Sequence, residues 1–140
     1  MAGELILIVE DNEKNRKLVR DLLQFHKYRT VEAITGEEGV EIARMQRPDL
    51  ILMDIQLPGI DGFTAFRQLR EDPDTRGIPV IAVTASAMPQ DRERILAAGF
   101  DGYQTKPISV KTLPDMVRDI VKDRSGSRPR RPQSPPGDAS

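Results

Sequence analysis

Five polar residues whose side chains could act together follow short apolar runs in this chain of 140 residues: Glu10, Asp11, Asp54, Thr84 and Lys106. Three carboxylates brought close together repel one another, and a hard divalent cation such as Mg²⁺, which prefers oxygen ligands, offsets that repulsion. A lysine adds a further positive charge, and a threonine adds a hydroxyl donor. Such a set predicts Mg²⁺-dependent chemistry on a phosphoryl group attached to an acidic nucleophile.

The apolar runs that precede these residues have the length and composition of buried β-strands. Each is short, continuous and bounded by polar residues, as expected for strands that are covered on both faces. A fifth run, less hydrophobic than the others, is a plausible further strand. The expected strands are residues 5–9, 30–34, 50–53, 80–83 and 102–104.

Helical patterns separate the expected strands. Leu18, Leu22 and Phe25 recur at helical spacing and predict an apolar stripe, which Val19 and Leu23 widen. Thr35 precedes the next helix as its expected N-cap. The further helices are expected over residues 35–45, 63–69 and 89–98, and from about residue 112 onward.

This alternation predicts one α/β domain, a five-stranded parallel sheet with helices on both faces, over residues 1–124. In such sheets ligands bind at the carboxyl ends of the strands, near the point where the strand order reverses. All five polar residues stand at those ends. They are therefore expected to converge although they lie far apart in the sequence.

The composition excludes several other kinds of site. Lys and Arg number 21 against 22 Asp and Glu, and this balance argues against a protein that coats nucleic acid or an anionic membrane. The absence of Cys and the presence of one His exclude thiolate or His-cluster metal sites and a Cys nucleophile. No apolar run approaches the roughly 20 residues that cross a bilayer, and the N-terminus does not resemble a signal peptide. We therefore expect a cytoplasmic protein.

Residues 125–140 differ from the rest of the chain. They contain four Pro, four Ser, two Gly and three Arg, without a large apolar side chain. This composition predicts a disordered Pro/Ser/Arg-rich tail of charge +2, which leaves −3 on residues 1–124. A basic docking tail and a linker to a further domain are the alternatives.

Four stretches of the sequence together resemble the receiver domain of two-component response regulators. They are ILIVEDNEKNRKLV, PDLILMDIQLPGIDG, IPVIAVTASAM and AAGFDGYQTKPIS, and they span residues 4 to about 122. The resemblance implies a flavodoxin-like (βα)5 domain with strand order 2-1-3-4-5. The segments TASAMPQDRER and KPIS further resemble stand-alone receivers of the cell-division type and receivers of hybrid kinases.

The resemblance also implies a role for each acidic residue. Asp54 would accept the phosphoryl group from a phosphohistidine. Asp11 and Asp54 would bind Mg²⁺ directly, together with the backbone carbonyl of Gln56. Glu10 would act through a metal-bound water, and it departs from the Asp-Asp pair that is common in the family.

The remaining implied roles concern the response to phosphorylation. Lys106 would pair with Asp54 and then with the phosphoryl oxygens, and its bond to Pro107 would be cis. Thr84 would hydrogen-bond the phosphoryl group, and Tyr103 would be the aromatic residue of the switch. Each has a purely structural alternative: Thr84 as a strand residue, Lys106 as a solvated charge and Tyr103 as a packing residue. The lone His26 is expected to be an exposed residue or a C-terminal cap of a helix, not a phosphohistidine.

The implied function is that of a single-domain response regulator that is not an enzyme, although it assists its own phosphoryl transfer and dephosphorylation. Its expected partners are a sensor histidine kinase or histidine phosphotransfer protein, and a downstream protein that binds the face of the fourth helix, fifth strand and fifth helix. Neither nucleic acid nor membrane is an expected partner, and a monomer or weak homodimer is expected.

Three alternatives stay open. The chain could be the receiver part of a larger transcription factor or hybrid kinase, or a scaffold that acts without phosphorylation. It could also be a phosphatase with an Asp nucleophile, but such enzymes use a second Asp two residues after the nucleophile, where this chain has Gln56.

Overall fold

The structure, a computed structural model, describes residues 3–125 as five strands that alternate with five helices. The strands are β1 (Leu5–Val9), β2 (Arg29–Ala33), β3 (Leu50–Asp54), β4 (Val80–Thr84) and β5 (Gly102–Thr105). The helices are α1 (Glu13–Phe25), α2 (Gly36–Gln46), α3 (Gly62–Glu71), α4 (Pro89–Ala98) and α5 (Thr112–Ser125). All five strands and all five helices were predicted. Strand β2 begins and ends one residue earlier than expected, and β3, β4 and β5 each extend one residue further.

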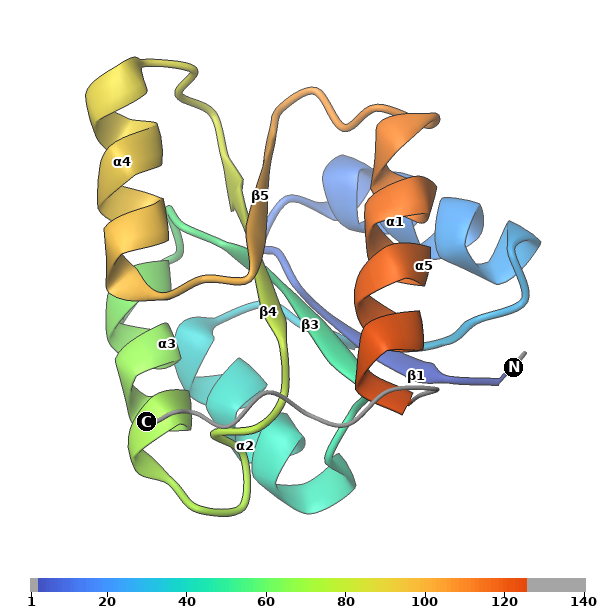
Figure 1. The fold of residues 1–140 in the computed structure, drawn as a ribbon, viewed down its shortest axis with the longest axis horizontal. Helices are drawn as coiled ribbons and strands as arrows, with labels where there is room; N and C mark the ends of the chain where they lie inside the picture. The colour runs from blue at the N-terminus through green and yellow to red at the C-terminus, as the bar shows by residue number, and fades with distance from the viewer. Residues whose placement is uncertain (1–2, 126–140) are drawn as a thin grey trace.

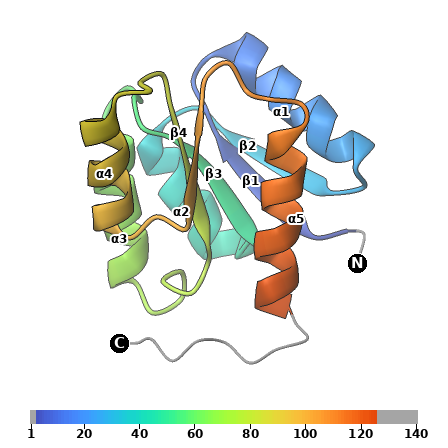
Figure 2. The same cartoon turned by 45° about the horizontal axis from the view of Figure 1, so that its top comes forward.

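The strands form one parallel sheet in the order β2-β1-β3-β4-β5. This is the flavodoxin-like order, and it confirms the predicted fold. Helices α1 and α5 cover one face of the sheet, and α2, α3 and α4 cover the other (Figure 1). Figure 2 shows the same two helical layers from a second direction. The strand order reverses at β1 and β3, so the carboxyl ends of these two strands lie side by side.

Each face of the sheet has its own hydrophobic core. On one face, Val40 of α2, Phe66 of α3 and Ile95 of α4 are buried against the strands. On the other face, Leu23 of α1 and Val117 of α5 are buried against them. Because β1, β3 and β4 are covered on both sides, their residues are almost all apolar, as the sequence pattern indicated.

The buried face of α1 differs from the predicted stripe. Leu18 and Phe25 are 40% and 78% exposed, whereas Val19 and Leu23 are buried. Adjacent helical residues point about 100° apart. When the face centred on Val19 and Leu23 is buried, the side chains of Leu18 and Phe25 therefore remain largely exposed. The packing against the sheet and α5 selects between the two.

Side-chain caps begin the helices near the functional end of the sheet. Asn12 accepts a hydrogen bond from the Asn15 amide at the start of α1, and Asp61 does the same for Thr64 in α3. The predicted cap Thr35 accepts from the Glu38 amide. These caps fix where each helix starts relative to the strand that precedes it.

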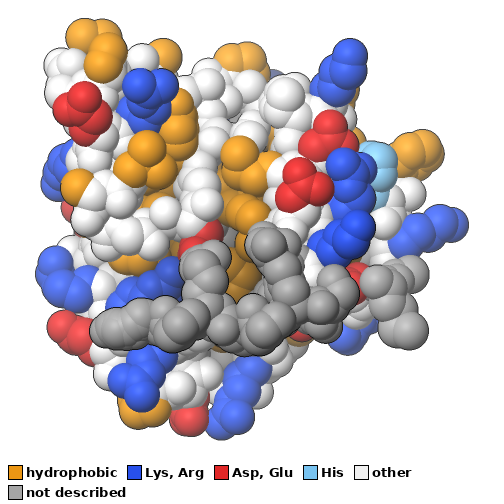
Figure 3. Space-filling model, in the orientation of Figure 1, with side chains coloured by type: hydrophobic (Ala, Val, Ile, Leu, Met, Phe, Trp, Pro, Cys, Tyr) orange, Lys and Arg blue, Asp and Glu red, His pale blue; other side chains and the backbone are white. Residues whose placement is uncertain are grey.

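On the face drawn in Figure 3, basic side chains are interspersed with acidic ones. Within residues 3–125, no helix is long and apolar enough to cross a membrane. The predicted tail lies outside the described residues except for Ser125, which is the last residue of α5.

Candidate functional site

The acidic residues converge where β1 and β3 end. These strands are paired, with Val9 opposite Met53, so the residues that follow them lie at the same edge of the sheet. Glu10, Asp11 and Asp54 each offer a carboxylate oxygen, and the three oxygens lie within 4.8 Å of one another. Glu10 and Asp54 are buried, and Asp11 is exposed to solvent. The convergence predicted from the sequence is therefore confirmed for the three carboxylates.

Lys106 reaches into this cluster from the end of β5. Its backbone N–H donates to the carbonyl of Thr84, which fixes the lysine beside the end of β4. Its Nζ lies 2.9 Å from Oδ2 of Asp54 and 3.3 Å from Oε1 of Glu10. The bond between Lys106 and Pro107 is cis, as expected. The solvated-charge interpretation of Lys106 is wrong because its ammonium group binds two buried carboxylates.

Burial and mutual charge shift the acid–base properties of the cluster. Burial, followed by the charge of Asp54, raises the pKa of Glu10 to about 7. Burial alone would lower the pKa of Lys106, but its hydrogen bond to Asp54 and the charges of Asp54 and Glu10 raise it above its ordinary value. The lysine is therefore charged at neutral pH, whereas Glu10 exchanges its proton there.

The chain around Asp54 is held tightly. Oδ1 of Asp54 accepts a hydrogen bond of 2.9 Å from the Gln56 amide, on the side away from Lys106. Behind it, α3 begins so close to β3 that a Cβ on Gly62 would lie 2.5 Å from the Asp54 carbonyl oxygen and 2.7 Å from Cα of Ile55. Only glycine permits this approach. The Asp54 carboxylate thus projects from a rigid backbone.

Thr84 is buried at the end of β4 and is connected to the start of α4. Its Oγ1 accepts a hydrogen bond of 3.1 Å from the Ser86 amide. The Ser86 hydroxyl donates to Oδ2 of Asp91 at 2.5 Å and accepts from the Met88 amide. The Thr84 hydroxyl therefore belongs to a short network that reaches the first turn of α4.

Tyr103 lies on β5, half-buried against the core formed by α2, α3 and α4. Interaction with the Tyr103 side chain raises the pKa of Arg92, on α4, above its ordinary value. His26 caps the end of α1 through its backbone, as expected, and its ring packs edge-on against Phe25.

The sequence patterns did not indicate Gly62, Ser86 or Arg16, which all contact residues of the site. The second glycine of the run PGIDG was the available signal for Gly62, because a glycine near the end of a strand often marks a close approach of the backbone. The contacts of Ser86 and Arg16 each involve a backbone group, the Ser86 amide and the Glu10 carbonyl. Because every residue has such groups, these contacts leave no pattern in the residue types.

The family model described as the response regulator receiver domain matches residues 6–118, which include every residue of this cluster. The chain belongs to the response regulator receiver domain family. It is 48% identical over 118 residues to the polar-differentiation response regulator DivK of Brucella anthropi, covering 84% of this chain and 96% of that protein.

Solved receiver domains have the same fold. The receiver domain of a sensor histidine kinase from Pseudomonas aeruginosa PAO1, solved with a magnesium ion coordinated in its active site cleft, is 38% identical, with a TM-score of 0.79 over 86% of this chain and 98% of that one. A receiver domain of a histidine kinase from Syntrophus aciditrophicus is 32% identical, with a TM-score of 0.82 over 94% of this chain and 99% of that one.

The family assignment makes this receiver domain a signalling protein that acts as a phosphorylation-dependent switch. Receiver domains bind Mg²⁺, and they interact with histidine kinases or phosphotransfer proteins and with downstream proteins. The three converging carboxylates suit a hard cation, since Mg²⁺ prefers carboxylate oxygens and retains several waters. The similarity to DivK over 96% of that protein does not favour the alternative that the chain is the receiver part of a larger transcription factor or hybrid kinase.

Proposed function

We propose that the protein is a stand-alone cytoplasmic response regulator that accepts a phosphoryl group on Asp54 from a sensor histidine kinase or histidine phosphotransfer protein. The observation that carries this proposal is the position of the buried Asp54. Its carboxylate accepts hydrogen bonds from the Lys106 ammonium and the Gln56 amide, and it lies beside the acidic pair at the end of β1. The similarity to DivK, over 96% of the length of that response regulator, supports a stand-alone role.

Asp11 and Asp54 would hold Mg²⁺ directly, with the backbone carbonyl of Gln56 as a third ligand and Glu10 acting through a bound water. The exposure of Asp11 leaves room for the waters that Mg²⁺ retains. A bound ion would supply positive charge to offset that of the phosphoryl oxygens beside Asp54. The role of the Gln56 carbonyl rests on the family resemblance, while its amide contact keeps this residue beside the carboxylate.

The chemical step is a transfer between two nucleophiles. A carboxylate oxygen of Asp54 attacks the phosphorus of the phosphohistidine, the P–N bond breaks, and the imidazole leaves with the bonding electron pair. Lys106 remains protonated throughout because its pKa is raised, so its ammonium can follow the negative charge from the carboxylate to a phosphoryl oxygen. The protein assists this step without acting as an enzyme of repeated turnover.

The response follows from the charge that phosphorylation adds, about −1.5 to −2 at pH 7. The Thr84 hydroxyl accepts from Ser86 and has its own proton to donate to a phosphoryl oxygen. Movement of Thr84 would change the network to α4 and the space beside Tyr103. The output surface would then be the face of α4, β5 and α5, where Met88 and Leu96 are about half exposed, and Figure 3 shows hydrophobic side chains over α4.

The partner on that face would be a downstream protein, and the regulator would be a monomer or weak homodimer that binds neither nucleic acid nor membrane. Gln56 argues against a phosphatase, because its amide cannot protonate a leaving group from the position that an Asp occupies in such enzymes.

Phosphotransfer profiling against the host's histidine kinases tests this proposal. One kinase is expected to label the wild-type chain rapidly, to a limit of one phosphoryl group per chain. Multiple-turnover hydrolysis of a small phosphomonoester would contradict the proposed function and support the phosphatase.

A further inference from the structure

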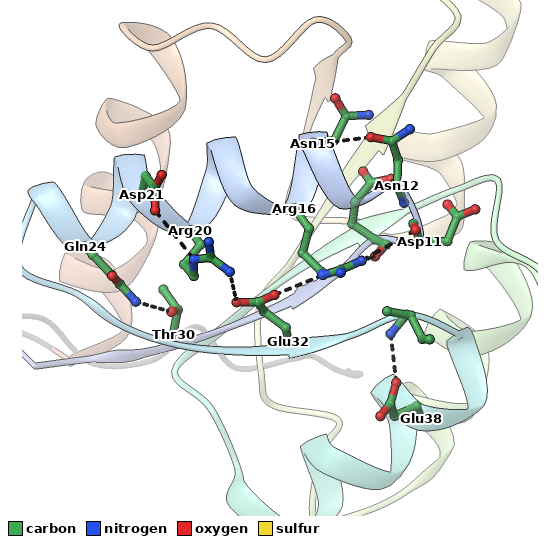
Figure 4. Close-up of polar contacts among 12 residues, drawn as sticks. Asp11, Asn12, Asn15, Arg16, Arg20, Asp21, Gln24, Thr30, Glu32 and Glu38 are labelled. Carbon is green, nitrogen blue, oxygen red and sulfur yellow. Dashed lines mark hydrogen bonds and ion pairs between the residues drawn. The ribbon is translucent and has the colours of Figure 1, made fainter.

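The side chain of Arg16 folds back from α1 over the loop that carries the acidic pair. Its Nη1 donates to the backbone carbonyl of Glu10 at 3.0 Å and lies 3.5 Å from that of Asp11. Figure 4 shows the guanidinium between this loop and β2. Arg16 therefore binds the backbone of both residues without touching their carboxylates.

Glu32 of β2 holds the other side of this guanidinium. Its Oε1 accepts from Nε of Arg16 at 2.9 Å, and its Oε2 accepts from Nη1 of Arg20 at 3.1 Å. The side chains of Arg16 and Glu32 are only 18% and 26% exposed, so solvent screens their ion pair incompletely. Each carboxylate oxygen of Glu32 thus has its own arginine, and the carboxylate cannot turn without losing a partner.

The loop is tied to β2 at two places. The Glu10 amide donates to the Ala33 carbonyl at 3.0 Å. In the next peptide, the Glu10 carbonyl accepts from Arg16, whose guanidinium is bound in turn by Glu32 of β2. The planar guanidinium has donors in a fixed fork, so it sets the distance and direction between Glu32 and the loop. Its contacts restrict the rotation of the peptide planes on which the Glu10 and Asp11 side chains stand.

The charges of Arg16 and Glu32 also affect the binding of a cation at the acidic pair. An arginine so close to the acidic pair would, by itself, oppose the binding of a divalent cation. The Glu32 carboxylate is shared with Arg20, so it offsets part of that charge on the side away from the loop. A positioning role and a purely electrostatic role of Arg16 therefore predict opposite changes in Mg²⁺ affinity when Arg16 is removed.

We propose that Arg16 is a positioning residue for the Mg²⁺ site: held by Glu32, it fixes the backbone of Glu10 and Asp11 in the arrangement that the ion requires. This inference rests on the proposed function, because it concerns the same cation site. It adds two residues, one on α1 and one on β2, to those that determine the affinity of the site.

Titration calorimetry of MgCl₂ into the full chain, freed of metal with EDTA, tests the inference without any phosphoryl transfer. Arg16→Met keeps the length of the side chain and removes the fork. Outer groups that orient metal ligands typically change affinity about 10-fold or more, so Arg16→Met is expected to weaken Mg²⁺ binding by about 10-fold. If Arg16 acted only through its charge, the same variant would bind Mg²⁺ more tightly, and this result would overturn the proposal.

Three further variants make the result specific. Arg16→Lys keeps the charge without the fork and is expected to bind Mg²⁺ as weakly as Arg16→Met; full recovery of the affinity would contradict positioning. Glu32→Gln releases the guanidinium and is expected to weaken binding too, which provides an independent test if Arg16→Met folds poorly. Lys17→Met removes one charge from an exposed i,i+4 ion pair of the same helix and is expected to leave Mg²⁺ affinity unchanged.

A purely structural bridge between α1 and β2 has its own signature. In that case Arg16→Met would lower the thermal unfolding temperature in EDTA but leave Mg²⁺ affinity at the wild-type value, and the inference would be wrong. Failure of the wild-type chain to bind Mg²⁺ would overturn both this inference and the proposed function. Normal binding by both wild type and Arg16→Met would overturn the inference alone.

Discussion

The ammonium group of Lys106 lies 2.9 Å from Oδ2 of Asp54, although 52 residues separate the two in the sequence. The contact joins the carboxyl ends of β3 and β5 across β4, which pairs with both strands. It places the positive charge where negative charge would accumulate in the proposed phosphorylation of Asp54. The lysine would then serve the unphosphorylated carboxylate and the phosphorylated one from nearly the same position.

Replacement of Lys106 by Met is expected to slow phosphorylation by acetyl phosphate by about 100-fold. A prearranged charge aimed at developing negative charge typically contributes this much. Initial rates of label incorporation at saturating Mg²⁺ measure the effect. Lys111→Met, at an exposed position, serves as the control, and a Lys106→Met rate equal to that of the control would contradict the role of the lysine.

Glu10 is expected to make the metal-free protein less stable as the pH rises towards neutrality. Its pKa is about 7 in the folded state against an ordinary value of 4.5, so the folded state holds the proton more tightly. Its contribution to stability is complete below about pH 4.5 and is lost as the pH rises to about 7. Mg²⁺ competes with this proton, so Mg²⁺ affinity is expected to rise over the same interval.

Urea denaturation in EDTA at pH 5, 6, 7 and 8 measures this dependence, and Glu10→Gln removes the titrating group while keeping its shape. The difference in unfolding free energy between wild type and variant is expected to shift with pH in favour of the variant up to about pH 7. A difference that stays constant across this range would exclude Glu10 as the source.

Gly62→Ala is expected to destabilise the protein and to impair phosphorylation together. The added Cβ would meet the Asp54 carbonyl oxygen at 2.5 Å, so either α3 or the end of β3 must shift. Overpacking of this kind typically costs about 1–3 kcal/mol. Gly102→Ala is the comparison, because its Cβ would meet only side-chain ends, those of Met116 at 3.0 Å and Ile120 at 3.8 Å.

The two effects of Gly62→Ala are separable by chemical denaturation and by the rate of acetyl phosphate labelling at a temperature where the variant remains folded. If labelling of the folded variant proceeds at the wild-type rate, the close approach of α3 does not position Asp54.

Thr84→Val is expected to permit phosphorylation while weakening the response. Valine keeps the branched shape of the strand residue but removes the hydroxyl that would bind a phosphoryl oxygen. The amide chemical shifts of α4, β5 and α5 are expected to change less with beryllofluoride than in wild type. Thr105→Val, at the position paired with Thr84 across β4 and β5, is the matched control. A wild-type response in Thr84→Val would refute its role in the switch.

The convergence of the side chains of the candidate site could be predicted from the sequence because it follows from topology. Once strands are assigned as parallel, their carboxyl ends share an edge, and Glu10, Asp54 and Lys106 must approach one another. The buried strands β3 and β4 carried the strongest signal, since both of their faces are covered and every residue of each is buried.

Features that depend on side-chain packing could not be predicted in the same way. The sequence of α1 allowed stripes centred on Leu18 or on Val19, and only contact with the sheet and α5 selects Val19. The reach of Arg16 to the Glu10 carbonyl involves a backbone acceptor, which every residue possesses. Neither the amino-acid types nor their spacing distinguish such a contact from a solvated arginine.

The central claim is that Asp54 is the site of phosphorylation, and the most direct test is the stoichiometry of labelling of wild type and Asp54→Asn. With Mg²⁺ and a cognate kinase or acetyl phosphate, wild type is expected to take up one acid-labile, base-labile phosphoryl group per chain. Asp54→Asn, and wild type in EDTA, are expected to take up none. A stable label of normal yield in Asp54→Asn would contradict the account.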